Sequence, residues 1–369
     1  MASSNHNSSG SSFKDKKFSQ TIKDDIRHGD FKRNFSRDFK DIYYFYLDDE
    51  TRDRLNKMPK WKRWLFVAWW VLKSMFFKLT PFRRILFLIG FVLVISQQVS
   101  TISPQNNNLK IGFLFFLLII ILELKDKLLA QDELKTGREV QLALLPKQNP
   151  VFPGWEIWMY TLPANDVGGD LVDYLEVGDR LGITLGDVAG KGLGAALFAG
   201  KFQATLRALA PRTKSLEELA SEMNTIFLRD GLPEKFVSLI YLELLPGKGG
   251  VRFLNAGHFP PLIIRDEGTE EMPRGGNALG LTPKSEYNEQ SVELEEEEIF
   301  LIYSDGLTEA RNEKGDFFGD KRFMDLLPGL QKLSAEDAGK RVLKVIERFV
   351  GEARQNDDIS LVIIKRLGE

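Results

Sequence analysis

The chain has 369 residues, a formal net charge of −2 and no cysteine. These values exclude disulfides, thiolate metal sites and a cysteine nucleophile, and nothing in the overall charge indicates binding to nucleic acid. Of the three histidines, His6 and His28 lie in a polar N-terminal stretch, so any metal ion must be held mainly by carboxylates. Such ligands favour Mg²⁺ or Mn²⁺.

Residues 1–60 are predicted to form a polar cytoplasmic region that is partly disordered. The first twelve residues are rich in Ser and Asn and show no apolar periodicity. Phe31, Phe35 and Phe39 recur at helical spacing. They indicate either a docking helix or a small amphipathic helix that folds back on the chain or on a membrane.

Residues 61–124 are predicted to form an interfacial helix followed by two transmembrane helices. Trp and Lys alternate with apolar residues over 61–79, a composition that suits the headgroup layer; a third spanning helix that tolerates Lys73 is the alternative. Ile85–Ile95 and Ile111–Leu122 are apolar runs joined by a short polar turn, which indicates a membrane hairpin. Lys and Arg are concentrated on its outer flanks, which predicts a multi-pass protein of the inner (cytoplasmic) membrane with residues 147–369 in the cytoplasm.

Residues 125–146 are predicted to form a connecting helix, because a helical pattern runs from 123 to 145 and ends before Pro146. Leu124, Leu128, Leu142 and Leu145 follow an imperfect heptad seam. This pattern predicts a homodimer that pairs through residues 123–145.

Residues 147–369 alternate strand and helix patterns and are predicted to form an α+β domain of antiparallel sheets covered by helices. Strands are expected at Trp155–Thr161, Asp170–Val177, Leu181–Asp187, Phe236–Leu244, Val251–Asn255, Pro261–Ile264, Ile299–Tyr303 and Ile359–Ile364. Helices are expected at Leu193–Ala210, Leu216–Leu228 and Ala335–Val350. Ser215 and Glu218 form a capping box for the second helix.

Four acidic residues stand at the ends of apolar strands, namely Asp170, Asp187, Asp305 and Asp357. Taken singly, such residues are typical of turns that cap hairpins. If the fold brings them together, their like charges need a cation to neutralise them. The spacing alone leaves both interpretations open.

The ordered motifs PANDVGGDLVDY, GDVAGKG, NAGH, YSDGLTEA and NDDISLVIIK resemble the metal-dependent PPM protein phosphatases. More narrowly, they resemble the bacterial branch typified by the sporulation stage II E phosphatase domain. The resemblance implies an αββα sandwich of two antiparallel sheets flanked by helices, with two Mn²⁺ or Mg²⁺ ions between the sheets. It implies that Asp187 bridges the metals, that the Val188 carbonyl and Asp170 are further ligands, and that Asp305 and Asp357 complete the second metal.

The resemblance also suggests supporting roles for four neighbouring residues. Asp173 and Asp358 would stand behind the ligands. Lys191 would contact phosphate or remain a solvated turn lysine, and His258 would act near the leaving oxygen or remain a structural turn histidine.

The implied activity is hydrolysis of phosphoserine or phosphothreonine by metal-activated water, without a phosphoenzyme. The implied substrate is a phosphorylated regulatory protein, such as an anti-anti-sigma factor. Two alternatives are an inactive phosphatase-fold scaffold and a membrane sensor that only binds partners.

Overall fold

The computed structural model describes residues 55, 59–99, 107–231, 234–246 and 249–368. The chain divides into two compact units, residues 1–127 and residues 128–369. Helix α6 (Asn108–Leu144) contributes residues to both. The division falls close to the predicted start of the connecting helix. The predictions for residues 1–54 lie outside the described residues.

The second unit contains two five-stranded sheets in which all the paired strands are antiparallel. Sheet A has the order β1-β10-β9-β6-β7, and sheet B has the order β2-β3-β4-β5-β8. The strands are β1 (Trp155–Leu162), β2 (Leu171–Val177), β3 (Arg180–Val188), β4 (Val237–Leu244), β5 (Gly250–Ala256), β6 (Leu262–Arg265), β7 (Gly268–Glu271), β8 (Glu289–Glu293), β9 (Ile299–Tyr303) and β10 (Ile359–Arg366).

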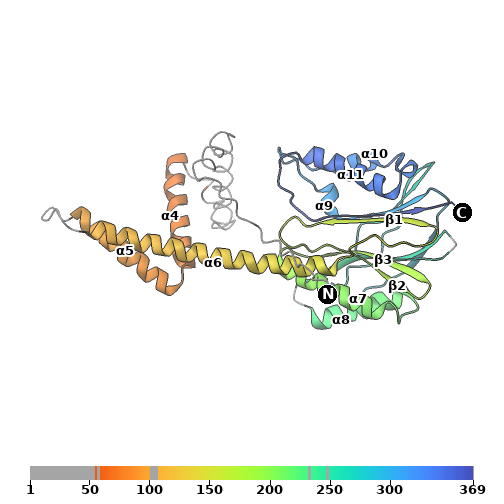
Figure 1. Cartoon of the computed structure of the whole chain (residues 1–369), viewed down its shortest axis with the longest axis horizontal. Helices are drawn as coiled ribbons and strands as arrows, with labels where there is room; N and C mark the ends of the chain where they lie inside the picture. The colour runs from red at the N-terminus through yellow and green to blue at the C-terminus, as the bar shows by residue number, and fades with distance from the viewer. Residues whose placement is uncertain (1–54, 56–58, 100–106, 232–233, 247–248, 369) are drawn as a thin grey trace, which may run out of the picture. The chain divides into compact units, whose positions relative to one another are not determined.

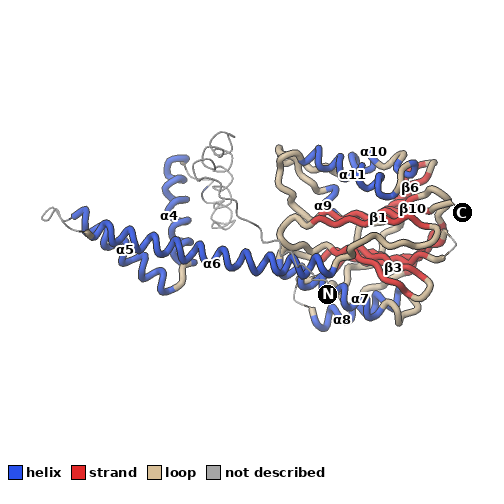
Figure 2. The backbone as a smooth tube through the Cα atoms, in the orientation of Figure 1, coloured by secondary structure: helices blue, strands red, loops and turns tan. Residues whose placement is uncertain are grey.

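Helices cover the outer face of each sheet, so the unit is an αββα sandwich (Figures 1 and 2). Helices α7 and α8 pack on sheet B, and α10 and α11 pack on sheet A. Their bounds are α7 (Leu193–Leu209), α8 (Leu216–Asp230), α9 (Asp305–Thr308), α10 (Asp320–Leu326) and α11 (Ala335–Val350), with a 3-10 turn η1 at Leu330–Lys332. The predicted arrangement of sheets and helices is confirmed.

The core between the sheets comes from the alternation of side chains along the strands. In β3, Ile183 and Leu185 face sheet A, and the small residues Gly182 and Gly186 face the helices. The Phe253 and Phe300 rings, one from each sheet, meet edge to face with centroids 5.3 Å apart. This packing holds the two sheets at a fixed separation, and therefore fixes the positions of residues at the strand ends.

The predicted helix termini agree closely with those observed. The Ser215 hydroxyl accepts hydrogen bonds from the amides of Glu217 and Glu218, which confirms the predicted N-cap of α8. Strands β7 and β8 were not predicted, because they are edge strands with mostly exposed, polar side chains. Edge strands of this kind lack the apolar alternation that marks a half-buried strand.

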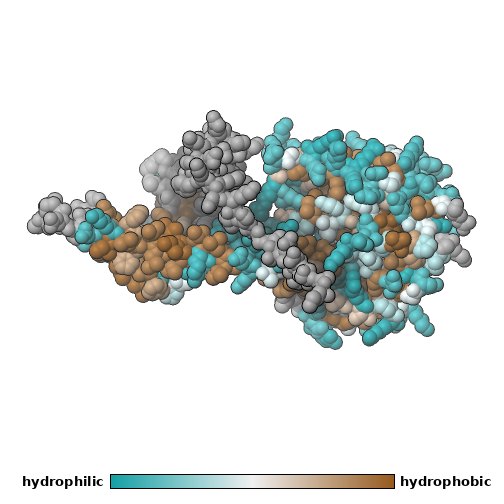
Figure 3. Space-filling model, in the orientation of Figure 1, coloured by the Kyte–Doolittle hydropathy of each residue, from teal (hydrophilic) through white to brown (hydrophobic). Residues whose placement is uncertain are grey.

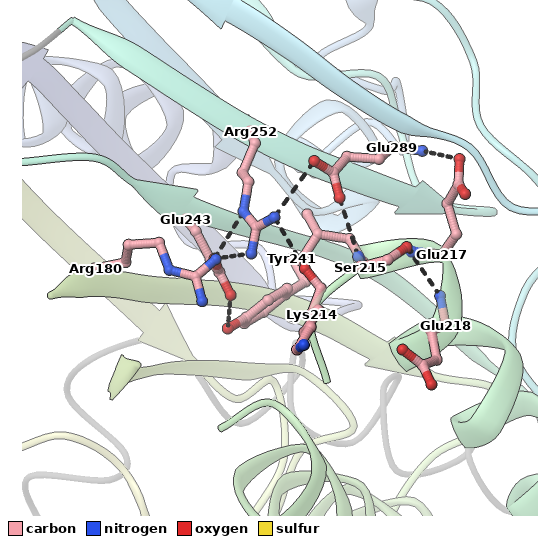
Figure 4. Close-up of polar contacts among 10 residues, drawn as sticks. Arg180, Lys214, Ser215, Glu217, Glu218, Tyr241, Glu243, Arg252 and Glu289 are labelled. Carbon is pink, nitrogen blue, oxygen red and sulfur yellow. Dashed lines mark hydrogen bonds and ion pairs between the residues drawn. The ribbon is translucent and has the colours of Figure 1, made fainter. Parts of the chain in front are cut away.

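A buried ion-pair network joins the start of α8 to sheet B (Figure 4). The buried Glu243 carboxylate accepts bonds from Arg252 Nε at 2.8 Å and from the Tyr241 hydroxyl at 3.1 Å, and it pairs with Arg180 at 2.5 Å. Arg252 also reaches Glu289, which accepts the amide of the first residue of α8. Burial raises the pKa of Glu243. The network lies at the Glu243 end of β4. Ser238, which pairs with Asp187, lies near the other end of this strand, so we assign the network a structural role.

The first unit is a set of helices: α4 (Lys60–Lys78), α5 (Pro81–Val99) and the first part of α6. Arg83 of α5 pairs with Glu123 at 2.7 Å and with Asp126 at 2.5 Å. A Cβ atom on Gly112 would lie 2.9 Å from the carbonyl oxygen of Gly90, so the two glycines let α5 and α6 approach closely. Helices α5 and α6 therefore pack against each other.

None of the described helices combines the length and apolar composition needed to cross a membrane. The transmembrane hairpin predicted within residues 61–124 is therefore not supported. The apolar runs of α5 and α6 are each shorter than the roughly 20 residues that a span normally requires. Charged side chains border them closely, with Arg83 and Arg84 before the first run and Glu123 after the second.

Candidate active site

The four predicted carboxylates come together at one end of the sandwich. Asp170 directly precedes β2 and Asp187 is the penultimate residue of β3; these strands pair so that residues 171 and 186 are opposite. In sheet A, Asp305 follows β9 and Asp357 precedes β10, and the end of β9 lies beside the start of β10. Each carboxylate is thus presented by the end of a buried strand.

A buried serine pair connects the two sheets at this end. The Ser360 hydroxyl donates to Asp170 Oδ2 at 2.6 Å, and the Ser360 amide donates to the Ser304 hydroxyl at 2.9 Å. Both serines are completely buried. They stand inside the motifs YSDG and NDDIS, so the sequence contained a signal for them, but their roles were not predicted.

Asp358 organises the loop that carries Asp170. Its carboxylate accepts the amides of Ala164 at 2.7 Å, Gly169 at 2.6 Å and Asp170 at 3.3 Å. A Cβ atom on Gly168 would lie 2.4 Å from Asp358 Oδ2, so this position has no room for a side chain. Asp358 therefore holds the loop that ends in Asp170 through its backbone amides.

Gly169 lies against two of the predicted metal ligands. A Cβ atom at this position would be 2.9 Å from the Val188 carbonyl oxygen and 3.5 Å from Asp187 Oδ1. The Val188 carbonyl and the Asp187 carboxylate are therefore neighbours beside the loop that ends in Asp170. The second glycine of the GGD motif is what permits this close approach.

Burial and neighbouring charges raise the pKa values of Asp170, Asp187 and Asp305. Burial raises the pKa of Asp170 well above its usual range, and the charge of Asp187 adds to this. Burial, followed by the charges of Asp305 and Asp357, raises the pKa of Asp187 to about 6. Burial and the charge of Asp357 also raise the pKa of Asp305. A cation placed among these groups would relieve both the repulsion and the cost of burial.

One cation already contacts the cluster. Lys191 Nζ lies 2.8 Å from Asp357 Oδ2 and 2.8 Å from the carbonyl of Asn356. Lys191 thus forms an ion pair with a predicted ligand, and its two predicted roles, phosphate contact and solvated turn lysine, stay predictions. The oxygen donors of these side chains are of the kind that Mg²⁺ or Mn²⁺ prefers. Within the described ranges, however, no three acidic or histidine side chains are arranged so that they could hold a metal ion.

Asp173 lies apart from the carboxylate cluster. Its fully buried carboxylate accepts bonds from Arg207 Nε at 2.7 Å, Arg207 Nη2 at 2.6 Å and Gln203 Nε2 at 2.9 Å. Both partners belong to α7. Asp173 therefore fastens α7 to β2, and the structure does not bring it to the predicted ligands.

His258 occupies a tight turn at the edge of the cluster. The Asn255 side chain stabilises this turn. It accepts a hydrogen bond from the His258 amide at 2.8 Å and donates one to the His258 carbonyl at 3.1 Å. The imidazole is buried, its Nδ1 lies 2.9 Å from the Ser238 hydroxyl, and burial lowers its pKa to about 4. A neutral histidine held in this way fits the structural interpretation, although it borders the cleft described next.

A cleft of about 410 Å³ opens beside the carboxylates. Asp187 and Asp305 line it on one side, and the turn that holds His258 lines it on another. The complete lining consists of Asp187, Phe236, Ser238, Gly257, His258, Phe259, Pro260, Arg274, Gly275, Gly276 and Asp305. Arg274 was not predicted, because no motif surrounds it.

The comparison with known families agrees with this geometry. The family described as stage II sporulation protein E (SpoIIE) matches residues 177–367, which is more than half of the chain. The chain belongs to the SpoIIE family. The resemblance to SpoIIE-like PPM phosphatases inferred from the motifs is therefore confirmed.

Curated relatives resemble the same part of this SpoIIE-family chain. Protein IcfG of Synechocystis is 28% identical over 267 residues, which cover 63% of this chain and 41% of IcfG. Phosphoserine phosphatase RsbU of Bacillus subtilis is 23% identical over 244 residues, which cover 64% of this chain and 70% of RsbU. The chain thus spans about two fifths of the length of IcfG.

Solved structures of SpoIIE-like domains show the same fold. The SiaA-PP2C domain of Pseudomonas aeruginosa is 22% identical, with a TM-score of 0.58 over 66% of this chain and 99% of that domain. The PP2C phosphatase domain of SpoIIE from Bacillus subtilis is 16% identical, with a TM-score of 0.50 over 59% of this chain and 64% of that structure. At these identities the likeness supports the PP2C fold alone.

Proposed function

We propose that this SpoIIE-family chain is a metal-dependent protein phosphatase that hydrolyses phosphoserine or phosphothreonine. The observation that carries the proposal is the gathering of Asp170, Asp187, Asp305 and Asp357 at one end of the sandwich, beside an open cleft. Buried carboxylates gathered at a cleft, with raised pKa values at Asp170, Asp187 and Asp305, are a candidate functional site rather than a stabilising feature.

In this proposal, the carboxylates of Asp170, Asp187, Asp305 and Asp357 and the Val188 carbonyl would hold two metal ions. Two bound Mg²⁺ or Mn²⁺ ions would supply Lewis-acid catalysis, activating water and neutralising phosphate oxygens. Ser360 orients Asp170 through its 2.6 Å hydrogen bond.

Two further interactions would prepare these ligands. Asp358 holds the loop before Asp170 through three backbone amides. Lys191 pairs with Asp357 and neutralises part of the charge of the proposed ligands.

Metal dependence tests this function. The full-length chain, stripped with EDTA, should hydrolyse neither p-nitrophenyl phosphate nor a phosphoserine peptide, and Mn²⁺ or Mg²⁺ should restore both activities. Zn²⁺ alone should not, since the ligands are all oxygen atoms. Absence of hydrolysis at saturating Mn²⁺ and Mg²⁺, in a folded protein, would favour the inactive scaffold or the partner-binding sensor.

We further propose that the substrate is a phosphorylated regulatory protein, such as an anti-anti-sigma factor. RsbU and RsbP of Bacillus subtilis are both named phosphoserine phosphatases, and RsbP is 28% identical over 63% of this chain and 59% of RsbP. Proteins whose phosphoserine accumulates when the gene is deleted should identify the substrate, and no such accumulation would contradict this proposal.

The exposed apolar surface of α5 and α6 (Figure 3), together with exposed apolar residues of α4, supports two more proposals. The first is attachment to the inner membrane with the phosphatase unit on the cytoplasmic side, since Trp69 is 65% exposed and Lys73 lies 4.9 Å from the Trp70 ring centroid, as in interfacial segments. The second is a homodimer through residues 123–145, where Leu124 and Leu128 are exposed. Flotation with anionic vesicles tests the membrane proposal, and a chain that stays with the soluble fraction would contradict it. Sedimentation in detergent tests the dimer proposal, and a monomer at all concentrations would contradict it.

A further inference from the structure

The loop between β7 and β8 is fastened to the rim of the cleft at several points. Near its start, the Met272 amide donates to the Pro261 carbonyl at 2.9 Å. Near its middle, Leu279 exchanges two backbone hydrogen bonds with Val237, of 3.0 and 2.8 Å. Between these points, the Gly276 amide donates to the Asn255 carbonyl at 3.0 Å. The loop therefore has a defined path along the ends of β4 and β5.

Two glycines allow this loop to pack closely, Gly275 against β5 and Gly276 against a later part of the loop itself. A Cβ atom on Gly275 would be 1.8 Å from the Asn255 carbonyl oxygen, and one on Gly276 would be 2.3 Å from the Glu286 carbonyl oxygen. Backbone oxygens cannot move away as a flexible side chain would. The residue before these glycines, Arg274, is consequently delivered to the cleft from a fixed backbone position.

Arg274 is the one cationic residue among the described residues that line the cleft with Asp187 and Asp305. Its side chain is exposed, and in the described parts of the chain no hydrogen bond or ion pair engages its guanidinium. The nearby lysines are occupied: Lys191 pairs with Asp357, and Lys235 donates to the Ala189 carbonyl at 2.7 Å. Arg274 therefore retains all its donors for a ligand in the cleft.

We propose that Arg274 binds the phosphate group of the substrate at the rim of this cleft, a role that rests on the proposed phosphatase function. The planar guanidinium offers paired N–H donors that match two phosphate oxygens, and charge-assisted bonds of this kind are the stronger class. A phosphoserine side chain entering beside Asp187 and Asp305 would present its dianion between the metal ligands and Arg274. Arg274 selects the phosphate and orients it.

Two substitutions test this role, Arg274→Gln and Arg274→Lys. Both are assayed with p-nitrophenyl phosphate as substrate and with inorganic phosphate as inhibitor. We expect Arg274→Gln to raise both the KM and the inhibition constant of phosphate by about tenfold, the usual effect of losing a charged hydrogen bond. Arg274→Lys keeps the positive charge but loses the paired N–H donors, so it should retain part of the phosphate affinity that Arg274→Gln loses. The matched control is Arg341→Gln, an exposed arginine on α11 that should behave as wild type.

Calorimetric titration of inorganic phosphate into the Mg²⁺-loaded full-length chain separates this inference from the proposed function. Weaker phosphate binding by Arg274→Gln than by wild type and Arg341→Gln supports the inference, even if the wild type proves inactive. Equal binding overturns it, even in an active phosphatase. A KM that rises only for a phosphoprotein substrate, with unchanged phosphate binding, also overturns it, because Arg274 would then contact the protein and not the phosphate.

Discussion

Replacement of Asp187 by Asn should abolish phosphatase turnover, by about a thousandfold or more, which corresponds to roughly 4 kcal/mol of transition-state stabilisation. Asp187 is the carboxylate that the charges of Asp305, Asp357 and Asp358 all affect, so it occupies the middle of the cluster. The substitution removes one negative charge and one oxygen donor from the position at which both metal ions would be held. Steady-state hydrolysis of p-nitrophenyl phosphate at saturating Mn²⁺ measures the loss.

The same substitution should stabilise the metal-free fold. The pKa of Asp187 rises from 3.8 to about 6 on folding, so the folded state binds protons more tightly than the unfolded state. The stability of the metal-free wild type should therefore fall as the pH rises from about 4 through about 6, by an amount on the order of 2 kcal/mol, and Asp187→Asn should lessen that fall. Urea unfolding in EDTA at several pH values measures both effects.

Asp325→Asn is the matched control, since Asp325 is an exposed residue of α10. It should change neither turnover nor the pH dependence of stability. Near wild-type activity of Asp187→Asn at saturating Mn²⁺ would refute the assignment of Asp187 as the central ligand.

Replacement of Asp358 by Asn should reduce both stability and activity, unlike the same change at its neighbour. Asp358 accepts three backbone amides of the loop before β2, and an Asn side chain turns an NH₂ group toward some of these donors. Orphaned buried donors cost about 1 to 3 kcal/mol each, so we expect a loss of about 3 kcal/mol and a fall in turnover of about a hundredfold as Asp170 loses its support.

Asp357→Asn provides the contrast for this prediction. The Asp357 carboxylate is about one third exposed and pairs with the largely exposed Lys191, so its replacement should leave the stability of the metal-free chain within about 1 kcal/mol of wild type. It should instead weaken metal affinity and turnover. Equal unfolding midpoints for Asp358→Asn and wild type, measured in EDTA, would show that the three amides do not depend on Asp358.

The sequence alone determined the elements whose signals are local. Ile299–Tyr303 and Ala335–Val350 were predicted with the observed bounds, because an unbroken apolar run and a helical period depend only on neighbouring residues. The sequence also predicted that the four carboxylates lie at the ends of strands. The family resemblance, rather than spacing, indicated that they belong together.

Only the tertiary structure decided which side chains meet. Gly169 and Asp358 are 189 residues apart, and Arg207 of α7 reaches Asp173 of β2, so no local period could reveal either partnership. The same reason explains why Asp173 proved to be an anchor for α7, and why Arg274 was missed until the fold placed its loop beside the cleft. Local patterns specify strands and turns, whereas partnership depends on packing between segments that the chain keeps far apart.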